Sequence, residues 1–166
     1  MIGFFDSGVG GLTVLEEVHK LIPEYDTIYL GDSVHAPYGK RPHKELVELT
    51  WTGVKWLFDQ GCDLVIVACN SASASALREI QQTKLSDYPG KRVLGVIRPT
   101  VEELSKKGFK NILVLSTQAT KDSGAYVAEF KKENPDIHVI PHACLKWASL
   151  VEAGAVGTPE MRKEVQ

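Results

Sequence analysis

The chain has few cysteines, and they form no pattern typical of a disulfide framework or a metal site. Its 166 residues include only Cys62, Cys69 and Cys144, with neither a C-x-x-C pair nor a Cys/His cluster. An odd number of unpaired thiols is typical of a reducing compartment. No secretory leader precedes the first apolar segment. The sequence therefore predicts a cytoplasmic protein without a bound metal.

A long apolar run and an excess of positive charge are also missing. The longest apolar run is far shorter than the ~20 residues that a membrane-spanning helix needs. The formal net charge is −2, and the 19 basic and 21 acidic residues are interspersed. This balance lacks the concentrated basic surface that nucleic-acid binding requires. We therefore expect neither a membrane nor a nucleic acid as partner.

What the chain does have is a regular alternation of strand-like and helix-like segments. This alternation predicts an α/β protein whose parallel sheet is covered by helices on both faces, a three-layer arrangement. Since the pattern restarts after Pro99, we expect an N-terminal α/β domain over residues 1–97 and part of a second, similar domain over 98–166. Strands are predicted over 2–5, 27–30, 64–70, 93–97, 111–115 and 137–140, and helices over 12–22, 43–60, 71–77, 99–107, 123–133 and 159–166.

The most informative segment is the apolar strand that ends in Cys69 and Asn70. Ligands of open α/β sheets bind beyond the carboxyl ends of the strands, which is where this spacing places Cys69. A helix-compatible segment follows, so the thiol lies near a helix N-terminus, where the dipole favours a thiolate. This pattern predicts a nucleophile or a proton-abstracting base. The alternative is a small buried hydrophobe, the usual role of cysteine.

The first strand ends in a glycine-rich segment, D-S-G-V-G-G at residues 6–11. A dinucleotide-binding fingerprint requires a third glycine where Thr13 stands. Asp32 lies near the end of the second strand, where a dinucleotide-binding domain has an acidic residue that binds the ribose. NAD binding therefore remains a minor alternative. Asp6 would repel a pyrophosphate but suits an ammonium group or a proton transfer. Its other interpretation is a turn or capping aspartate.

The second strand leads into a long loop that contains Tyr38 and Gly39. Tyr38 offers a hydroxyl, and the N–H group of Gly39 could approach a ligand closely. The alternative is a Pro-Tyr-Gly turn whose ring packs on the surface. His35 and His43 are interpreted as solvated histidines, with His43 at a helix start. The tryptophans Trp51, Trp56 and Trp147 are interpreted as core or half-buried packing residues.

Three strands of one sheet thus end in polar residues, and parallel strands bring these ends to one edge. The resulting pocket has a carboxylate, a thiol, an amide, hydroxyl groups and backbone N–H groups. Such a pocket suits a small zwitterion, and we expect it to need no cofactor.

These segments, in this order, resemble glutamate racemase, of the cofactor-independent aspartate/glutamate racemase superfamily. The resemblance rests on D-S-G-V-G-G, A-P-Y-G at 36–39 and A-C-N-S-A-S-A at 68–74. The segments L-S-T-Q-A-T at 115–120, S-G-A-Y at 123–126 and L-V-E-A-G at 150–154 are also similar. It implies two pseudo-symmetric α/β domains with the active site between them. It also implies interconversion of L- and D-glutamate, which supplies D-glutamate for peptidoglycan and so for the cell wall and cell shape.

The resemblance also implies roles for individual residues. Cys69 matches the first of two thiols that act on opposite faces of glutamate, and Asp6 matches the carboxylate that assists it. The implied partner is this small-molecule substrate, without a cofactor, and a homodimer is kept as an open alternative to a monomer. The positions that match substrate contacts are Asp6, Ser7, Tyr38, Gly39, Asn70 and Ser71.

The chain departs from the family pattern at the second thiol. That thiol lies in a Gly-Cys-Thr-His segment, and no such segment occurs here. Cys144 is a poor substitute because no Thr-His follows it, and Cys62 is a core candidate. We therefore expect a fragment or an inactive copy. The alternatives are a non-catalytic remnant that binds a dicarboxylic amino acid, and a related racemase of aspartate or another acid.

Overall fold

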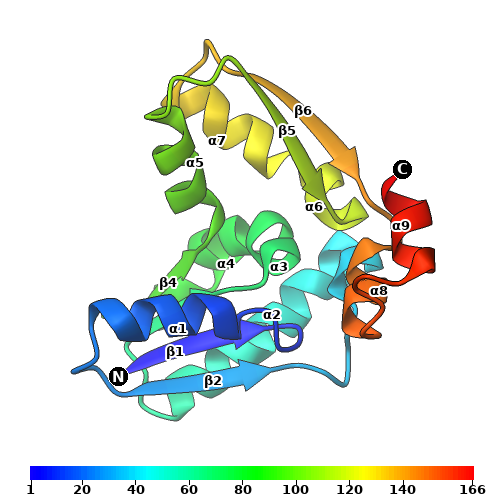
Figure 1. The fold of residues 1–166 in the computed structure, drawn as a ribbon. Coiled ribbons are helices and arrows are strands. Elements are labelled where there is room, and N and C mark those ends of the chain that lie inside the picture. The colour runs from blue at the N-terminus through cyan, green and yellow to red at the C-terminus, as the bar shows by residue number, and fades with distance from the viewer.

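The structure, a computed structural model, describes all residues 1–166 and contains two parallel sheets (Figure 1). The strands are β1 (Ile2–Asp6), β2 (Thr27–Gly31), β3 (Leu64–Val67), β4 (Arg92–Gly95), β5 (Asn111–Ser116) and β6 (His138–Ala143). The α-helices are α1 (Leu12–Leu21), α2 (His43–Asp59), α3 (Asn70–Ser75), α4 (Leu77–Thr83), α5 (Ile97–Ser105), α6 (Gln118–Ser123), α7 (Ala125–Glu133), α8 (Trp147–Glu152) and α9 (Pro159–Val165). Two short 3₁₀ helices, η1 (Tyr38–Lys40) and η2 (Leu85–Asp87), complete the chain.

The first sheet has the strand order β2-β1-β3-β4, and every pair in it is parallel. The predicted α/β class is therefore confirmed. Every residue of the central strand β1 is buried, because strands of a parallel sheet are covered on both faces. The carboxyl ends of β1 and β3 lie side by side, with Phe5 opposite Val67. We call this sheet with its helices the N-terminal unit.

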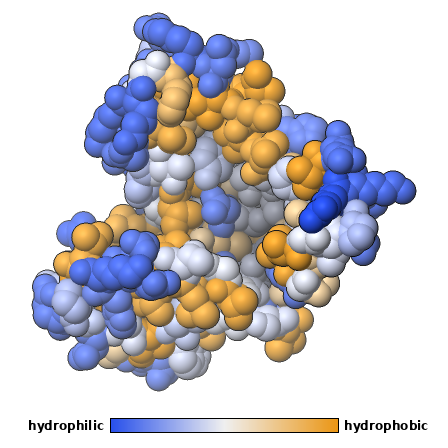
Figure 2. Space-filling view, viewed as in Figure 1, coloured by the Kyte–Doolittle hydropathy of each residue, from blue (hydrophilic) through white to orange (hydrophobic).

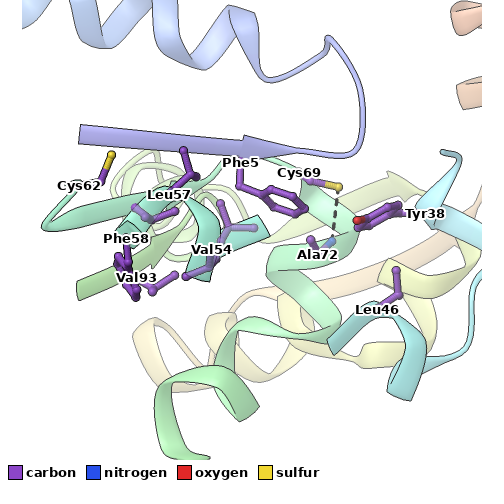
Figure 3. Close-up of a cluster of buried hydrophobic side chains, with 12 residues drawn as sticks. Phe5, Tyr38, Leu46, Val54, Leu57, Phe58, Cys62, Cys69, Ala72 and Val93 are labelled. Atoms are coloured by element: carbon purple, nitrogen blue, oxygen red, sulfur yellow. Dashed lines mark hydrogen bonds between the residues drawn. The ribbon is translucent and has the colours of Figure 1, made fainter. Parts of the chain in front are cut away.

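The core of the N-terminal unit lies between this sheet and α2 (Figure 3). Leu46, Val54 and Leu57 are fully buried on one face of α2, and their spacing of three to eight residues explains why this segment forms an amphipathic helix. Cys62 is fully buried in this cluster, so its predicted core role is confirmed. Cys69 lies at the opposite end of the cluster. The site is thus built at the rim of a packed core.

Helix α1 differs from its prediction as a helix with one buried face. None of its residues is buried, and Leu12 and Leu21 are exposed. Leu15 and Val18 are half-buried. The apolar periodicity therefore predicted the helix correctly but overestimated how far the N-terminal unit covers it.

The second sheet pairs β5 with β6 in parallel. Helices α5 and α7 cover one face around a small core that includes Val101 and Phe130. The other face exposes Leu113, Leu115 and Ile140, and apolar atoms gather over β5 in the space-filling view (Figure 2). We call α5 to α7 with β5 and β6 the C-terminal unit. The domain boundary at residues 97/98 stays a prediction.

Several element boundaries differ from the sequence prediction. Strand β3 stops at Val67 rather than continuing to residue 70, because the backbone turns there into the start of α3. Helix α5 begins at Ile97, before Pro99, since proline is tolerated in the first turn of a helix. The predicted helix over 123–133 corresponds to α7, which begins only at Ala125, because Gly124 before it is in the left-handed region at φ 64°. Helices α4, α6 and α8 were not predicted.

The predicted start of the last helix is confirmed. The Thr158 hydroxyl accepts a hydrogen bond from the Met161 N–H at 3.3 Å, and Pro159 occupies the first turn of α9. The tryptophan predictions hold in part: Trp51 and Trp147 are half-buried, but Trp56 is exposed. No helix of the chain combines the length and the apolar composition that crossing a membrane requires.

Replacement of Gly53 by alanine tests the packing of α2 against β1. A Cβ atom at Gly53 would lie 2.2 Å from the Phe5 ring, and both residues are buried in the core. We expect Gly53→Ala to lower the free energy of unfolding by about 1–3 kcal/mol, since overpacking outweighs the gain in helix propensity. Urea unfolding measures this change. The exposed neighbour Thr52→Ala is the control and should change it by less than about 0.5 kcal/mol; equal effects would contradict this account.

Candidate active site at the carboxyl ends of β1 and β3

Cys69 is the N-cap residue of α3, at the point where the chain leaves β3. Its Sγ accepts a hydrogen bond from the Ala72 N–H at 3.5 Å, and its S–H group donates to the Ser7 Oγ at 3.5 Å (Figure 3). The side chain is only 6% exposed. The thiol is therefore buried, but it has polar neighbours from both β3–α3 and the loop after β1.

Burial and charge decide the protonation of this thiol. The pKa of Cys69 is raised, first because burial disfavours the charged form and second because Asp6 is negative. The hydrogen bonds from Ser7 and Ala72 act in the opposite direction. The helix N-terminus thus favours the thiolate through the Ala72 N–H, as expected, but burial and Asp6 together outweigh it.

Asp6 holds the glycine-rich loop in place. Its Oδ2 atom accepts hydrogen bonds from the Gly11 N–H at 3.0 Å, the Gly8 N–H at 3.3 Å and the Tyr29 hydroxyl at 3.3 Å. The interpretation as a turn aspartate therefore describes part of its role. All three bonds go to the same oxygen, so Oδ1 has no partner within the protein. The single proton of the Tyr29 hydroxyl is shared with the Gly8 carbonyl, which lies closer at 2.9 Å, so Tyr29 holds both the carboxylate and the loop.

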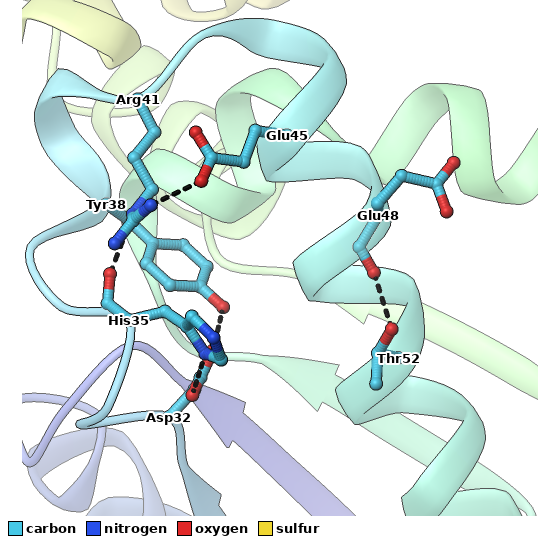
Figure 4. Close-up of polar contacts among 7 residues, drawn as sticks. All are labelled: Asp32, His35, Tyr38, Arg41, Glu45, Glu48 and Thr52. Atoms are coloured by element: carbon cyan, nitrogen blue, oxygen red, sulfur yellow. Dashed lines mark hydrogen bonds and ion pairs between the residues drawn. The ribbon is translucent and has the colours of Figure 1, made fainter.

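The loop after β2 places Tyr38 inside the protein rather than on its surface (Figure 4). The side chain is 1% exposed, and its ring lies 6.2 Å from that of Phe5. Its hydroxyl donates to Asp32 at 2.7 Å, and burial and this partner both raise the pKa of Tyr38. The surface-turn alternative is therefore wrong. Because the hydroxyl proton is donated to Asp32, the Tyr38 hydroxyl can bind a ligand only as a hydrogen-bond acceptor.

Asp32 and the two histidines have local partners. Asp32 pairs with the Nδ1 of His35 at 2.8 Å as well as with Tyr38, so its side chain organises the loop. His35 and His43 are both exposed enough to be solvated, as predicted. His43 begins α2 and lies 2.9 Å from Glu79. Arg41 also stabilises the loop, by donating to the carbonyl of His35 and pairing with Glu45 (Figure 4).

Gly39 makes room for the C-terminal unit. A Cβ atom there would lie 2.6 Å from the side chain of Thr117. The sequence analysis expected a close approach of a ligand at this position, and the structure has a close approach of a side chain instead. The absence of a side chain at Gly39 therefore lets η1 pack against the start of α6.

Helix α3 connects the two units through polar side chains. Ser71 is buried, and its hydroxyl shares a hydrogen bond of 2.8 Å with the Thr117 hydroxyl. Thr117 in turn lies 3.1 Å from the Thr120 hydroxyl. The Tyr126 hydroxyl donates to the Asn70 Oδ1 at 2.7 Å. The predicted residues Asn70 and Ser71 thus contact the C-terminal unit directly.

The sequence analysis did not identify Thr117, Thr120 and Tyr126 as site residues. Thr117 follows β5 directly, so it lies at a strand's carboxyl end, as Cys69 does. The same rule, applied to the second sheet, could have identified Thr117 and Thr120. Tyr126 lies on α7, in the S-G-A-Y segment that contributes to the family resemblance, but this segment by itself assigns no role to the side chain.

The structure brings the predicted residues together around the start of α3. The half-exposed Cys144 follows β6, where its N–H donates to the Ser116 carbonyl at 2.8 Å. It lines a shallow hollow together with Gly39 and Thr117. No group of three or more His, Cys, Asp or Glu side chains is arranged to hold a metal ion.

The chain is similar to proteins of known activity along nearly its whole length. No protein-family model matches it. A glutamate racemase of Caulobacter sp. (strain K31) is 45% identical over 184 residues, covering 99% of this chain and 65% of the relative. A glutamate racemase of Phenylobacterium zucineum (strain HLK1) is 44% identical, covering 93% of this chain and 61% of the relative. The chain thus spans less than two thirds of the length of these curated relatives.

Solved structures give the same result for the fold. A glutamate racemase isoform from Bacillus anthracis matches with a TM-score of 0.88 and 32% identity, covering 99% of this chain and 60% of that one. A glutamate racemase from Francisella tularensis in complex with D-glutamate matches with the same TM-score and identity, covering 98% of this chain and 60% of that one. The resemblance predicted from the motifs is therefore confirmed: in sequence and in fold, this chain is similar to about three fifths of a glutamate racemase.

Proposed function

We propose that these residues bind glutamate and that Cys69 removes its α-proton, as part of a racemase that interconverts L- and D-glutamate. The observation that carries this proposal is the position of Cys69. Its thiol lies at the carboxyl end of β3, next to Ser7, and within the electrostatic influence of Asp6. The similarity to glutamate racemases, one of them in complex with D-glutamate, supports the same substrate class.

The proposed step begins with the Cys69 thiolate. Its sulfur takes the α-proton and becomes a thiol, while the electron pair of the C–H bond stays on the α-carbon as a carbanion. Backbone N–H groups and hydroxyls around the substrate stabilise the charge that develops on its carboxylate. The α-proton is a very weak acid, so the sulfur has to be in contact with it before transfer.

The raised pKa of Cys69 makes substrate binding part of this step. In the free chain, burial and Asp6 both favour the neutral thiol. A bound amino acid brings an ammonium group, whose positive charge favours the thiolate and offsets the negative charge of Asp6. The Oδ1 of Asp6 has no protein partner and is suited to accept from that ammonium. We infer that the base forms only in the presence of substrate.

Racemisation also needs an acid on the opposite face of the carbanion. Cys62 is buried in the core, and Cys144 lines a separate hollow with Gly39 and Thr117, whose lining does not include Cys69. We therefore assign proton removal, and not the whole racemisation, to residues 1–166. We further propose a cytoplasmic location and a role in supplying D-glutamate for peptidoglycan. Whether the protein is a monomer or a homodimer is answered by its mass in solution, which light scattering measures.

The exchange of the α-proton with solvent tests the proposed step. In heavy water the 166-residue chain should introduce deuterium at the α-carbon of one glutamate enantiomer, without sustained conversion to the other. Cys69→Ser should abolish this exchange, because a hydroxyl is a far weaker base at neutral pH than a thiol. NMR of the substrate measures the exchange, and polarimetry measures conversion.

Cys144→Ser is the matched control, since it removes a thiol outside the proposed chemistry and should leave the exchange rate unchanged. Sustained racemisation that Cys144→Ser abolishes would show instead that Cys144 is the second acid. Binding of D-glutamate without any exchange would favour the second candidate function, a non-catalytic binding module, which the neutral state of Cys69 favours. Exchange with D-aspartate but not with glutamate would indicate a related racemase.

The pH dependence of Cys69 alkylation tests the influence of Asp6. Since burial and Asp6 raise the pKa, the reaction with iodoacetamide should reach half its maximal rate above the ~8.5 of an ordinary thiol. Asp6→Asn should shift this midpoint to lower pH, because it removes the charge but keeps an oxygen that can accept from the loop. Peptide mass spectrometry distinguishes Cys69 from the other two cysteines.

The exposed Asp26→Asn is the control for this experiment. Asp26 lies before β2, at the end of the sheet away from Cys69, so its charge should not affect the midpoint. A midpoint that Asp6→Asn leaves unchanged or raises would contradict the assigned role of Asp6.

A further inference from the structure

The contact between Tyr126 and Asn70 joins the two units at the mouth of the candidate site. Tyr126 lies on α7, 56 residues along the chain from Asn70, and its hydroxyl donates to the Asn70 Oδ1 at 2.7 Å. Asn70 is exposed and is the first residue of α3, next to Cys69. A side chain of the C-terminal unit thus reaches an amide that the resemblance assigns to substrate contact.

The position of the Tyr126 hydroxyl is set by packing. The half-buried ring packs against the core of the C-terminal unit, which contains Val101 and Phe130. Burial raises the pKa of Tyr126, so the hydroxyl stays protonated and acts as a donor. The nearby pair Ser71–Thr117 ties the same helix to the same unit. The donor is therefore held rigidly relative to α3.

An asparagine amide has one acceptor oxygen and one NH₂ group with two donors, and the two ends exchange places when the group flips. When Oδ1 accepts from Tyr126, the flipped orientation loses this bond. The NH₂ group is then the end left to meet a ligand. A carboxylate has only acceptors, so it can bind the NH₂ end but is repelled by the oxygen end.

We propose that Tyr126 is a positioning residue, which holds the Asn70 amide so that its NH₂ group faces a carboxylate of the bound amino acid. This inference rests on the proposed function and adds a residue from the second unit to it. It explains why a tyrosine on α7 contributes to a site whose reacting group lies on the β3–α3 turn. The role of Tyr126 is exerted entirely through Asn70.

A double-mutant cycle on D-glutamate affinity, measured by calorimetry, tests the proposal. Tyr126→Phe removes only the hydroxyl and should weaken binding about fivefold, or about 1 kcal/mol for a neutral hydrogen bond. In an Asn70→Ala background the same change should have an effect of less than about twofold, because its target is gone. Tyr25→Phe makes the same chemical change at an exposed tyrosine and should leave the affinity unchanged.

The outcomes separate this inference from the proposed function. Equal losses of affinity in both backgrounds would show that Tyr126 acts only through the general structure. No loss of affinity in either background would show that Tyr126 has no role in binding. Each of these results would overturn this inference but not the proposed function. Failure of the unsubstituted chain to bind D-glutamate overturns the proposed function and this inference with it.

A second measurement does not depend on the folding of a variant. In the unsubstituted chain, the side-chain NH₂ resonances of Asn70, assigned by through-bond correlation to its own backbone, should shift when D-glutamate is added. A spectrum in which D-glutamate binds elsewhere and leaves these resonances in place would overturn the proposal.

Discussion

The site depends on one carboxylate oxygen, the Oδ2 of Asp6. It gathers the N–H groups of Gly8 and Gly11 and the hydroxyl of Tyr29, and so bends the chain back just after β1. This bend places Ser7 against the sulfur of Cys69. Glycine is required at position 11, since a Cβ atom there would lie 2.8 Å from that of Ala68. The geometry around the thiol therefore follows from a hydrogen-bonded turn on the neighbouring strand.

The negative charge of the same carboxylate opposes the proposed chemistry. A negative charge near a buried thiol disfavours the thiolate, and the burial that excludes water acts in the same direction. The hydrogen bonds of Ser7 and Ala72 offset only part of this effect. In the proposed function, the free chain therefore keeps Cys69 as a neutral thiol, and the ammonium group of the substrate offsets the charge of Asp6. The proposal thus couples ligand binding to the reactivity of Cys69 through Asp6.

Much of the fold and part of the site could be predicted from the sequence. The parallel sheet was predicted from apolar strands and from glycine or proline at the ends of segments, which are local signals. The same signals predicted that Asp6 and Cys69 lie at one edge of the sheet. The environment of Tyr38 could not be predicted, since its burial depends on Phe5 and its hydroxyl on Asp32. The direction of the Cys69 pKa shift could not be predicted, because the helix terminus and Asp6 are visible in the sequence, whereas the depth of burial is not. The contacts of Thr117 and Tyr126 depend on how the two units pack, which local patterns do not encode.

The attachment of α3 has a consequence for motion. This six-residue helix begins directly after Cys69, and within two turns Asn70, Ser71 and Ser75 each bond to the C-terminal unit. If one unit rotates as a rigid body against the other, it must strain or break these bonds together. A change in the angle between the two sheets would then always be accompanied by a change in the shape of the site. A small molecule bound far from Cys69 that prefers one angle would, by linkage, alter what happens at the sulfur.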